Sequence, residues 1–473
     1  MENAMWNFEQ FAENVAFVSD DGNQLTYSRL QEEIDKLAAS IGRRCLVFSM
    51  CSNTIGSVIG YISFMKNRIV PALLNEHLDD ELVTKLIASY SPSFIWIPNK
   101  HIEKFVHFEK VYECFGYTLL KVKNEIEYML HDELGLLLTT SGSTGSPKFV
   151  RQTYTNVFVN AEQIACYLEL DHTERPITTL PMNYTYGLSI INSHLMVGAT
   201  ILLTDKSMMT REFWTFMKEQ KATSFGGVPY TYEMMDKMRF FRMELPELRT
   251  MTQAGGKLSP ELHKKFALYA IENKKQFVVM YGACEATARM TYLPHERSLE
   301  KYGSMGIPIP GGKLAIIDEN DQVLEGAEVT GELVYEGPNV TMGYAERGDD
   351  LIKGDERNGI LRTGDMAKRD EDGFYYIVGR KKRFLKIYGN RVNLDEVDSM
   401  IKGKFNFMDC ASSGVDDHMY IFVTDESVVD EVRTFIVNKT GLNQTAFKVV
   451  LINQIPKNDA GKVLYTELSK YYE

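Results

Sequence analysis

The most informative stretch of the sequence is Leu136-Leu-Leu-Thr-Thr-Ser-Gly-Ser-Thr-Gly-Ser-Pro-Lys148. Its apolar start is typical of a buried strand, and it continues into hydroxyl residues and glycines that end in a lysine. Glycines allow backbone N–H groups to turn inward, hydroxyls add hydrogen-bond donors, and Lys148 supplies a point charge. Such a loop suits phosphates, although it does not satisfy the Walker A pattern Gly-x-x-x-x-Gly-Lys-[Ser/Thr]. A Ser/Gly-rich surface turn is the alternative interpretation.

Helix and strand patterns alternate on both sides of this loop. Between Leu30 and Ile41 the apolar residues recur at spacings of four, three and four, which predicts an amphipathic helix. The next run, 45–50, is short and continuously apolar, as in a strand that is buried on both faces. The same alternation returns in residues 81–97 and 211–228. It predicts an α/β architecture with mainly parallel sheets.

The length of 473 residues predicts more than one hydrophobic core. After about Lys313 the sequence predicts strands joined by Gly- and Asp-rich turns, which indicates a smaller β subdomain. The segment Gly379–Lys386 is strongly basic within an acidic protein and predicts a domain boundary. Beyond it, about ninety residues with helix and strand patterns are enough for a small α+β domain.

Composition and charge exclude several classes of function. A formal net charge of −12 argues against broad binding of nucleic acids or anionic membranes, which needs a basic surface. The six cysteines contain no CxxC pair and indicate neither a disulfide framework nor a zinc cluster, which favours a reducing compartment. The first residues of the given sequence do not show the basic n-region and apolar h-region of a signal peptide, and the most apolar stretch, Ile55–Met65, predicts a buried helix too short for a bilayer. We therefore expect a cytoplasmic protein without a membrane span.

Further motifs follow the loop along the chain. They are Tyr281-Gly-Ala-Cys-Glu285, Gly331-Glu-Leu with Gly343-Tyr344, Arg362-Thr-Gly-Asp365, Gly379-Arg380 with Lys386, and Pro456-Lys-Asn-Asp-Ala-Gly-Lys462. Together with Thr139–Lys148, this ordered set resembles the motifs of the adenylate-forming (AMP-binding) superfamily. That superfamily holds acyl-CoA synthetases, adenylation domains of peptide synthetases and beetle luciferases. The similarity covers essentially the whole chain.

The resemblance implies a specific domain organisation. Residues 1–381 would form an N-terminal domain of two stacked α/β subdomains and a β subdomain, which binds ATP and the acid. Residues 382–473 would form a small mobile α+β domain that carries the catalytic lysine. Lys382 falls at the hinge position, and a swing about it would withdraw that lysine and present the loop around Lys386-Ile-Tyr-Gly389 to build a thiol tunnel.

The resemblance also implies an ATP site. Tyr281 would stack on adenine, and Glu285 would reach a Mg²⁺ ion that bridges the phosphates. Asp365 would accept both ribose hydroxyls, with Arg380 assisting. The full implied set is Thr140, Ser141, Gly142, Ser143, Thr144, Gly145, Lys148, Ala254, Gly255, Gly256, Tyr281, Gly282, Cys284, Asp365, Arg380 and Lys386. Taken alone, Tyr281 would be a core aromatic, Asp365 a turn residue after Gly364, and Arg380 part of a solvated charge run. Their joint occurrence favours the nucleotide site.

Lys462 is the principal catalytic residue that the resemblance implies. It would contact the substrate carboxylate and the phosphate and stabilise charge as the carboxylate attacks the α-phosphorus. Glu285, Lys148 and Tyr184 complete the implied catalytic set, and Glu285 is the implied metal ligand. An exposed loop lysine is the alternative for Lys462, and simple wall packing is the alternative for Tyr184.

Three positions depart from the family pattern, one of them Lys382 at the hinge, where many members have Asp. Cys284 stands where the family usually has Thr, and because a thiol is a weaker donor, its contact with the α-phosphate would be weakened. We interpret it as a buried small apolar residue rather than a reactive one. Tyr465 stands where an Arg is often found.

The acyl pocket implied by the resemblance is mostly aromatic or apolar. It includes Tyr184, Tyr186 and the segment Phe225–Pro229. Gly187 stands where amino-acid-activating relatives have an Asp that pairs with the substrate amine. Because a buried ammonium without that carboxylate would be unpaired, we expect an aliphatic or aromatic acid that lacks an α-amine.

The function implied is ATP-dependent activation of a carboxylic acid to acyl-AMP, with Mg²⁺ as cofactor, and transfer of the acyl group to a thiol. The acceptor is coenzyme A or the phosphopantetheine of an acyl carrier protein that acts in trans. A carrier-protein amino-acid ligase, a luciferase-like oxygenase and a non-catalytic nucleotide-binding protein are the alternatives. Retention of Lys148, Glu285, Asp365 and Lys462 argues against the last.

Overall fold

The structure is a computed structural model that describes residues 4–123, 126–139, 148–388, 390–405, 409–457 and 463–472. The chain divides into two compact units. As far as they are described, unit 1 holds Met1–Thr140, Ser146–Lys313 and Tyr335–Leu361, and unit 2 holds Leu314–Val334 and Arg362–Glu473. In the part of the chain that the structure describes, no helix has the length and apolar character needed to cross a membrane.

Unit 1 contains an eight-stranded sheet in the order β19-β9-β8-β4-β3-β5-β7-β6. Its strands are β3 (Leu46–Cys51), β4 (Val70–Asn75), β5 (Phe94–Pro98), β6 (Glu109–Cys114), β7 (Tyr117–Lys121), β8 (Leu134–Thr139), β9 (Phe149–Thr153) and β19 (Gly343–Ala345). The central strands β8, β4, β3 and β5 are parallel, as the continuous apolar runs predict. The accompanying helices are α1 (Tyr27–Ile41), α2 (Ile55–Lys66) and α3 (Asp80–Tyr90). The predicted buried helix is α2, whose residues Ile55–Met65 are all buried.

A second sheet of unit 1 has nine strands in the order β16-β15-β14-β13-β12-β10-β11-β1-β2. They are β1 (Val15–Ser19), β2 (Gln24–Thr26), β10 (Pro176–Ile177), β11 (Ile201–Leu203), β12 (Ser224–Gly227), β13 (Thr250–Gln253), β14 (Gln276–Tyr281), β15 (Thr291–Tyr292) and β16 (Ile307–Pro308). The helices are α4 (Tyr154–Tyr167), α5 (Thr185–Met196), α6 (Arg211–Glu219), α7 (Pro229–Lys237) and α8 (Pro260–Glu272).

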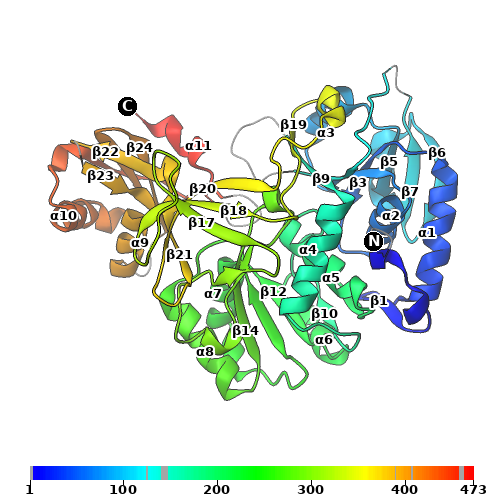
Figure 1. Ribbon diagram of the computed structural model, residues 1–473, viewed down its shortest axis with the longest axis horizontal. Coiled ribbons are helices and arrows are strands. Elements are labelled where there is room, and N and C mark those ends of the chain that lie inside the picture. Colours follow the sequence, from blue (N-terminus) through cyan, green and yellow to red (C-terminus); the bar gives the residue numbers. More distant parts are fainter. Residues whose placement is uncertain are drawn as a thin grey trace. The chain divides into compact units, whose positions relative to one another are not determined.

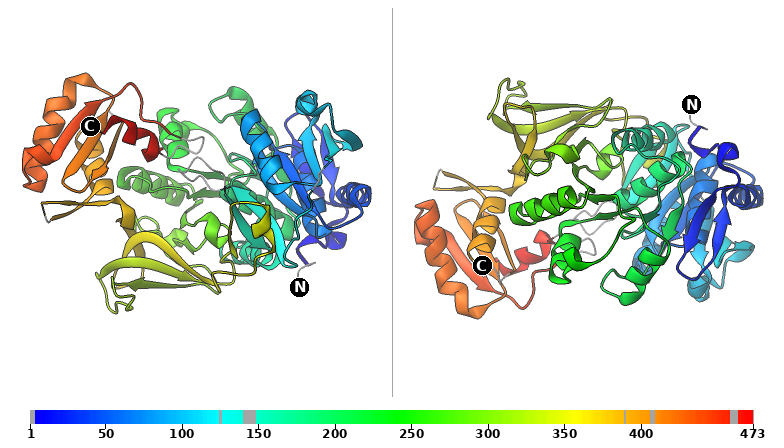
Figure 2. Two further views of the ribbon diagram at one scale, coloured as in Figure 1. Left: turned by 90° about the horizontal axis from the view of Figure 1, so that it is seen from above. Right: turned by 90° about the horizontal axis from the view of Figure 1, so that it is seen from below.

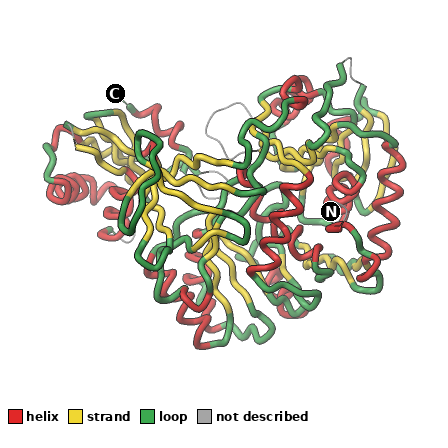
Figure 3. Tube along the Cα trace, in the orientation of Figure 1, coloured by secondary structure: helices red, strands yellow, loops and turns green. Residues whose placement is uncertain are grey.

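The two sheets of unit 1 share a core. Helices α4 and α5 lie between them (Figure 1), and one apolar face of each helix belongs to a buried cluster with Val47 of β3, Leu136 of β8 and Ile201 of β11. Helices and strands alternate throughout this unit (Figure 3). The predicted α/β class is therefore confirmed, because local apolar periods decide these elements.

Unit 2 begins with the four-stranded sheet β17-β18-β20-β21, which confirms the predicted β subdomain. Its strands are β17 (Lys313–Ile317), β18 (Thr330–Glu336), β20 (Ile360–Arg369) and β21 (Tyr375–Arg380). The contacts group this sheet with the C-terminal elements. These contacts show which elements form a compact unit, but they do not show which part of the chain moves. The predicted domain boundary between residues 381 and 382 therefore stays a prediction.

The C-terminal part of unit 2 is α+β, as predicted. Its elements are β22 (Phe384–Ile387), β23 (Asn390–Asn393), α9 (Leu394–Lys404), β24 (Cys410–Val415), β25 (His418–Val423), α10 (Val429–Thr440), β26 (Phe447–Leu451) and α11 (Tyr465–Leu468). Alternate residues of β25 face opposite sides, so Ile421 packs with α9 and α10 while Phe422 packs with α11. Figure 2 shows these helices on opposite faces of the sheet in orange and red.

Unit 1 contains two buried histidines, and we therefore expect it to lose stability in acid. Burial lowers the pKa of His263 and that of His194 from 6.5 to about 4. Because the pKa of each histidine is lower in the folded protein, its neutral form contributes to the free energy of unfolding. This contribution is complete above pH 6.5 and is lost as the pH falls through about 4. It amounts to on the order of 3 kcal/mol for each histidine. We expect the melting temperature to fall between these pH values, and His263→Gln to flatten the fall in a calorimetric pH series.

The matched control is His172→Gln, since His172 is exposed. It should leave the slope of melting temperature against pH unchanged. A slope that is equally steep in the wild type and in His263→Gln would contradict the assignment.

Candidate functional site

The predicted residues of unit 1 gather at one edge of the second sheet. Strands β12, β13 and β14 are parallel neighbours, and their carboxyl ends lead into Val228, Ala254 and Gly282. In open α/β sheets, ligands bind outside the carboxyl ends of the strands. The small residues 254–256 and Tyr281 therefore lie at this edge of the sheet, and their role in binding a nucleotide stays a prediction.

Tyr184 packs directly against the small-residue segment. Gly255 has a φ of +84°, and a Cβ atom there would lie 2.7 Å from the Tyr184 hydroxyl oxygen. Only glycine allows this close approach without strain. Burial, with a smaller contribution from the nearby Cys284, raises the pKa of Tyr184 to about 12. The phenol is therefore a neutral hydrogen-bond donor near neutral pH.

Lys148 and Glu285 are brought together by Tyr344. The Lys148 ammonium lies 3.8 Å from the centroid of the Tyr344 ring, and the Tyr344 hydroxyl donates to Glu285 Oε1 at 2.6 Å. The Arg357 guanidinium lies 4.7 Å from the centroid of the same ring. Burial and the Glu285 carboxylate both raise the pKa of Tyr344, so the phenol stays protonated. One aromatic ring thus holds the predicted phosphate-binding cation next to the predicted metal ligand.

Glu285 fits the role of a Mg²⁺ ligand. It is partly exposed, and its Oε2 has no hydrogen-bond or ion-pair partner among the described residues. Hard cations prefer such carboxylate oxygens. The motif Gly343-Tyr344 identifies Tyr344 in the sequence but does not indicate that this tyrosine contacts Lys148 and Glu285. Arg357 has no sequence signal, since only the fold places it against Thr341 and the Glu285 carbonyl.

The turn after β14 is held in an unusual conformation. A Cβ atom on Gly282 would overlap the carbonyl oxygen of Ala288. Thr287 has a φ of +63°, which is rare for a β-branched residue. The Asn339 amide donates to the carbonyls of Ala286 and Arg289 at 2.9 and 3.0 Å and fixes the turn. Strain of this kind persists where surrounding contacts hold it, commonly at functional sites.

Cys284 is partly exposed, so our interpretation of it as a buried apolar residue is wrong. Its thiol donates to the Thr139 carbonyl over 4.0 Å, at the end of β8 where the predicted phosphate loop begins. The sequence did not predict this exposure and contact because β8 and the turn after β14 come from different sheets. Sequence periodicity does not reveal that these two segments lie close together.

Several predicted residues lie outside the described residues. They are Thr140, Ser141, Gly142, Ser143, Thr144, Gly145, Gly389 and Lys462. Lys457 and Val463, which precede and follow residues 458–462, pair in an isolated antiparallel bridge. The backbone of Lys386 lies in β22.

In unit 2, the predicted ribose-binding pair is adjacent. Asp365 of β20 faces Arg380 of β21 in the sheet register, and their Oδ1 and Nε atoms are 3.5 Å apart. Arg380 is largely exposed, whereas the Asp365 side chain is mostly buried. Gly364 has a φ of +71°, so the backbone turns just before the carboxylate.

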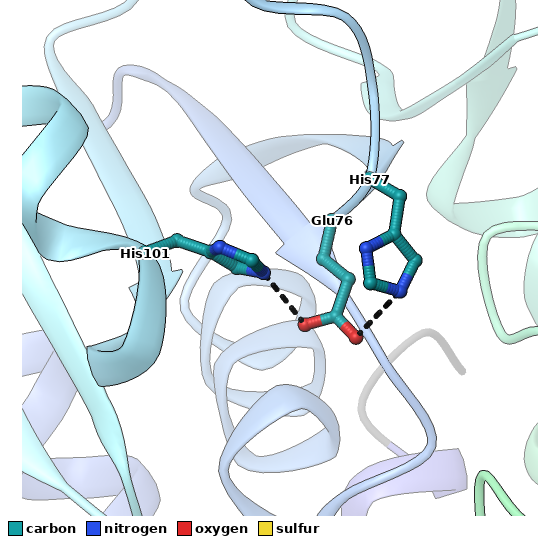
Figure 4. Close-up of side chains that lie close together, drawn as sticks. All are labelled: Glu76, His77 and His101. Carbon is teal, nitrogen blue, oxygen red and sulfur yellow. Dashed lines mark ion pairs between the residues drawn. The ribbon is translucent and has the colours of Figure 1, made fainter.

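A separate cluster in unit 1 joins Glu76, His77 and His101, whose potential ligand atoms all lie within 4.8 Å of one another (Figure 4). The His77 and His101 Nε2 atoms are 3.4 and 3.5 Å from the Glu76 carboxylate oxygens. The Lys100 ammonium lies 2.9 Å from both of these oxygens. Since this cation already neutralises the carboxylate, the cluster is explained as an ion pair with two flanking imidazoles.

Comparisons with known proteins agree with this geometry. A family model described as "AMP-binding enzyme" matches residues 5–345. A probable CoA ligase from Humulus lupulus is 26% identical, with 96% of this chain and 93% of that protein covered. The 2-succinylbenzoate–CoA ligase of Bacillus subtilis is 27% identical over 73% of this chain and 70% of its own length. The solved structure of O-succinylbenzoate coenzyme A synthetase from Bacillus subtilis with AMP has a TM-score of 0.80 at 21% identity, with 98% of both chains covered.

Proposed function

Because the chain belongs to the family of AMP-binding enzymes, we propose that it activates a carboxylic acid with ATP and passes the acyl group to a thiol. The observation that carries this proposal is the Lys148–Tyr344–Glu285 cluster, which holds a cation for phosphate beside a carboxylate whose Oε2 has no partner among the described residues and could bind a metal. ATP is the second substrate and Mg²⁺ the cofactor. Bound Mg²⁺ would neutralise phosphate charge.

In the first step, a carboxylate oxygen of the acid attacks the α-phosphorus of ATP. The bond between the α-phosphorus and the bridging oxygen breaks, and pyrophosphate leaves. Lys148 would hold the phosphates, and the neutral Tyr184 phenol would donate to the acid and orient it. Lys462 would stabilise the charge that develops at the α-phosphate.

In the second step, the sulfur of a thiol attacks the acyl carbon of the acyl-AMP. AMP leaves with the electrons of the broken C–O bond, and the thiol proton passes to solvent. The relatives named above are CoA ligases, which supports coenzyme A as the acceptor, with a carrier-protein phosphopantetheine as the alternative. Residues 382–473 would move about Lys382 between the two steps.

The decisive experiment measures pyrophosphate release with ATP, Mg²⁺ and a panel of fatty, aryl, dicarboxylic and amino acids, followed by mass spectrometry of the coenzyme A thioester. We expect acid-dependent release and a thioester of the same acid. Tight ATP binding without release for any acid would favour a non-catalytic nucleotide-binding protein. Release without a coenzyme A thioester would point to a carrier protein as the acceptor.

A further inference from the structure

Among the residues that the structure describes, unit 1 buries one arginine that has no ion pair with a carboxylate. Three arginines are buried in the described part of the chain, Arg151, Arg289 and Arg383, with 0%, 2% and 8% of their surfaces exposed. Arg151 pairs with Glu356, and Arg383 pairs with Asp395 and Asp398. Arg289 has no ion pair with any described carboxylate. Burying a charge without a counter-charge is costly, and Arg289 is the one of these three arginines that lacks a described counter-charge.

The partners of Arg289 are neutral. Its Nε donates to the Ser189 hydroxyl at 3.2 Å, and its Nη1 donates to the Tyr167 hydroxyl at 2.9 Å and to the Met280 sulfur at 3.2 Å. Its guanidinium carbon lies 5.2 Å from the centroid of the Tyr186 ring. Within the described residues, Nη2 makes no hydrogen bond. The fork of this guanidinium is therefore only partly satisfied, although a carboxylate could accept two parallel bonds from it.

The position of Arg289 connects it to the proposed acyl pocket. Tyr186 is one of the pocket residues, and its ring lies 6.4 Å from that of Tyr184, which packs against Gly255. Tyr184, Tyr186, Val228 and Ala254 belong to one apolar cluster. The Tyr186 ring, which the guanidinium faces, therefore connects the buried arginine to this cluster.

The positive charge of Arg289 also acts on its surroundings. Burial, with a smaller contribution from the charge of Arg289, lowers the pKa of His194 to about 4. An anion bound beside Arg289 would supply the missing counter-charge, whereas an ammonium group would be repelled. The same preference is indicated by Gly187, which stands where amino-acid-activating relatives have an Asp. A Cβ atom at Gly187 would overlap the Pro181 carbonyl oxygen, so no side chain fits there.

We propose that Arg289 binds a second anionic group, in the simplest case a carboxylate, at the end of the acid remote from the reacting carboxylate. This inference rests on the proposed function and names its substrate class. The acid is a short dicarboxylic acid, or an aryl acid with a distal carboxylate, whose distal group reaches the Arg289 guanidinium. A bidentate bond to the guanidinium would fix its orientation.

The test compares pairs of acids that differ only in the distal carboxylate. Pyrophosphate release is measured for succinate against butyrate, glutarate against pentanoate, adipate against hexanoate, and terephthalate against 4-methylbenzoate. We expect the wild type to prefer the diacid in at least one pair by 10-fold or more in kcat/KM. Arg289→Gln should lower kcat/KM for that diacid by about 10- to 100-fold and leave the monoacid unchanged. Arg289→Lys should be intermediate, since it keeps the charge and loses the fork.

The control variant is Arg249→Gln, a half-exposed arginine of unit 1 that pairs with Glu174. It should leave the diacid preference intact. If the wild type prefers the monoacid in every pair, or Arg289→Gln lowers both members of each pair equally, the arginine is structural and the inference fails while the proposed function stands. The wild-type comparison holds even if a variant misfolds. Absence of release with every acid, including the fatty and amino acids, overturns both.

Discussion

Replacing Lys462 by alanine is expected to reduce acid-dependent pyrophosphate release by about 10²- to 10³-fold, the loss seen when one preorganised donor to a developing charge is removed. The residue matches the last position of Pro456–Lys462, where the family resemblance places the catalytic lysine. Its ammonium would act on the α-phosphate mainly in the transition state. The change should therefore fall on kcat, with little change in the KM for ATP, and steady-state pyrophosphate assays measure both.

Lys457→Ala is the matched control in the same motif. The Lys457 ammonium pairs with Asp409 at 2.5 Å, and its backbone pairs with Val463, so its side chain has a structural role. Because a partly exposed ion pair contributes little, we expect kcat to change by less than about 5-fold. Equal losses in both variants would indicate a general effect on this segment, and wild-type kcat in Lys462→Ala would remove the catalytic assignment.

The elements of the fold were predictable because their signals are local. The period of apolar residues from Leu30 to Ile41 corresponds to α1, which begins after Thr26, whose side chain accepts a hydrogen bond from the Arg29 amide. Continuous apolar runs became the buried parallel strands β3 and β5. The pattern could not predict which strands pair, since sheet order joins segments far apart in sequence, such as β1 and β11.

The candidate site was predicted in its residue types but not in its connections. Lys148 and Glu285 come from motifs that the resemblance identifies, whereas their common contact with Tyr344 depends on the approach of β19 to β9. Arg289 follows the motif Tyr281–Glu285 and carries no pattern that distinguishes it from a surface arginine. Its burial, and the absence of a described carboxylate beside it, emerged only from packing. The exposure of Cys284 was missed for the same reason.

The turn after β14 supports the second large effect, which we expect from Gly282→Ala. The added methyl group would overlap the Ala288 carbonyl oxygen, and backbone on both sides cannot yield as a flexible side chain would. The turn would have to move, and it carries Glu285 and Arg289. We expect at least a 100-fold loss of pyrophosphate release, by analogy with loss of a placed catalytic group, together with a lower melting temperature.

Gly403→Ala separates this steric effect from the general effect of replacing a glycine. Gly403 lies in α9 with open space around its Cβ position, so alanine should raise stability by up to about 1 kcal/mol through helix propensity. Activity should stay at the wild-type level. The two variants are compared by pyrophosphate release and by thermal unfolding followed with circular dichroism. Wild-type release in Gly282→Ala would show that the turn can relax without displacing Glu285, and the geometry of this turn would then not be required for catalysis.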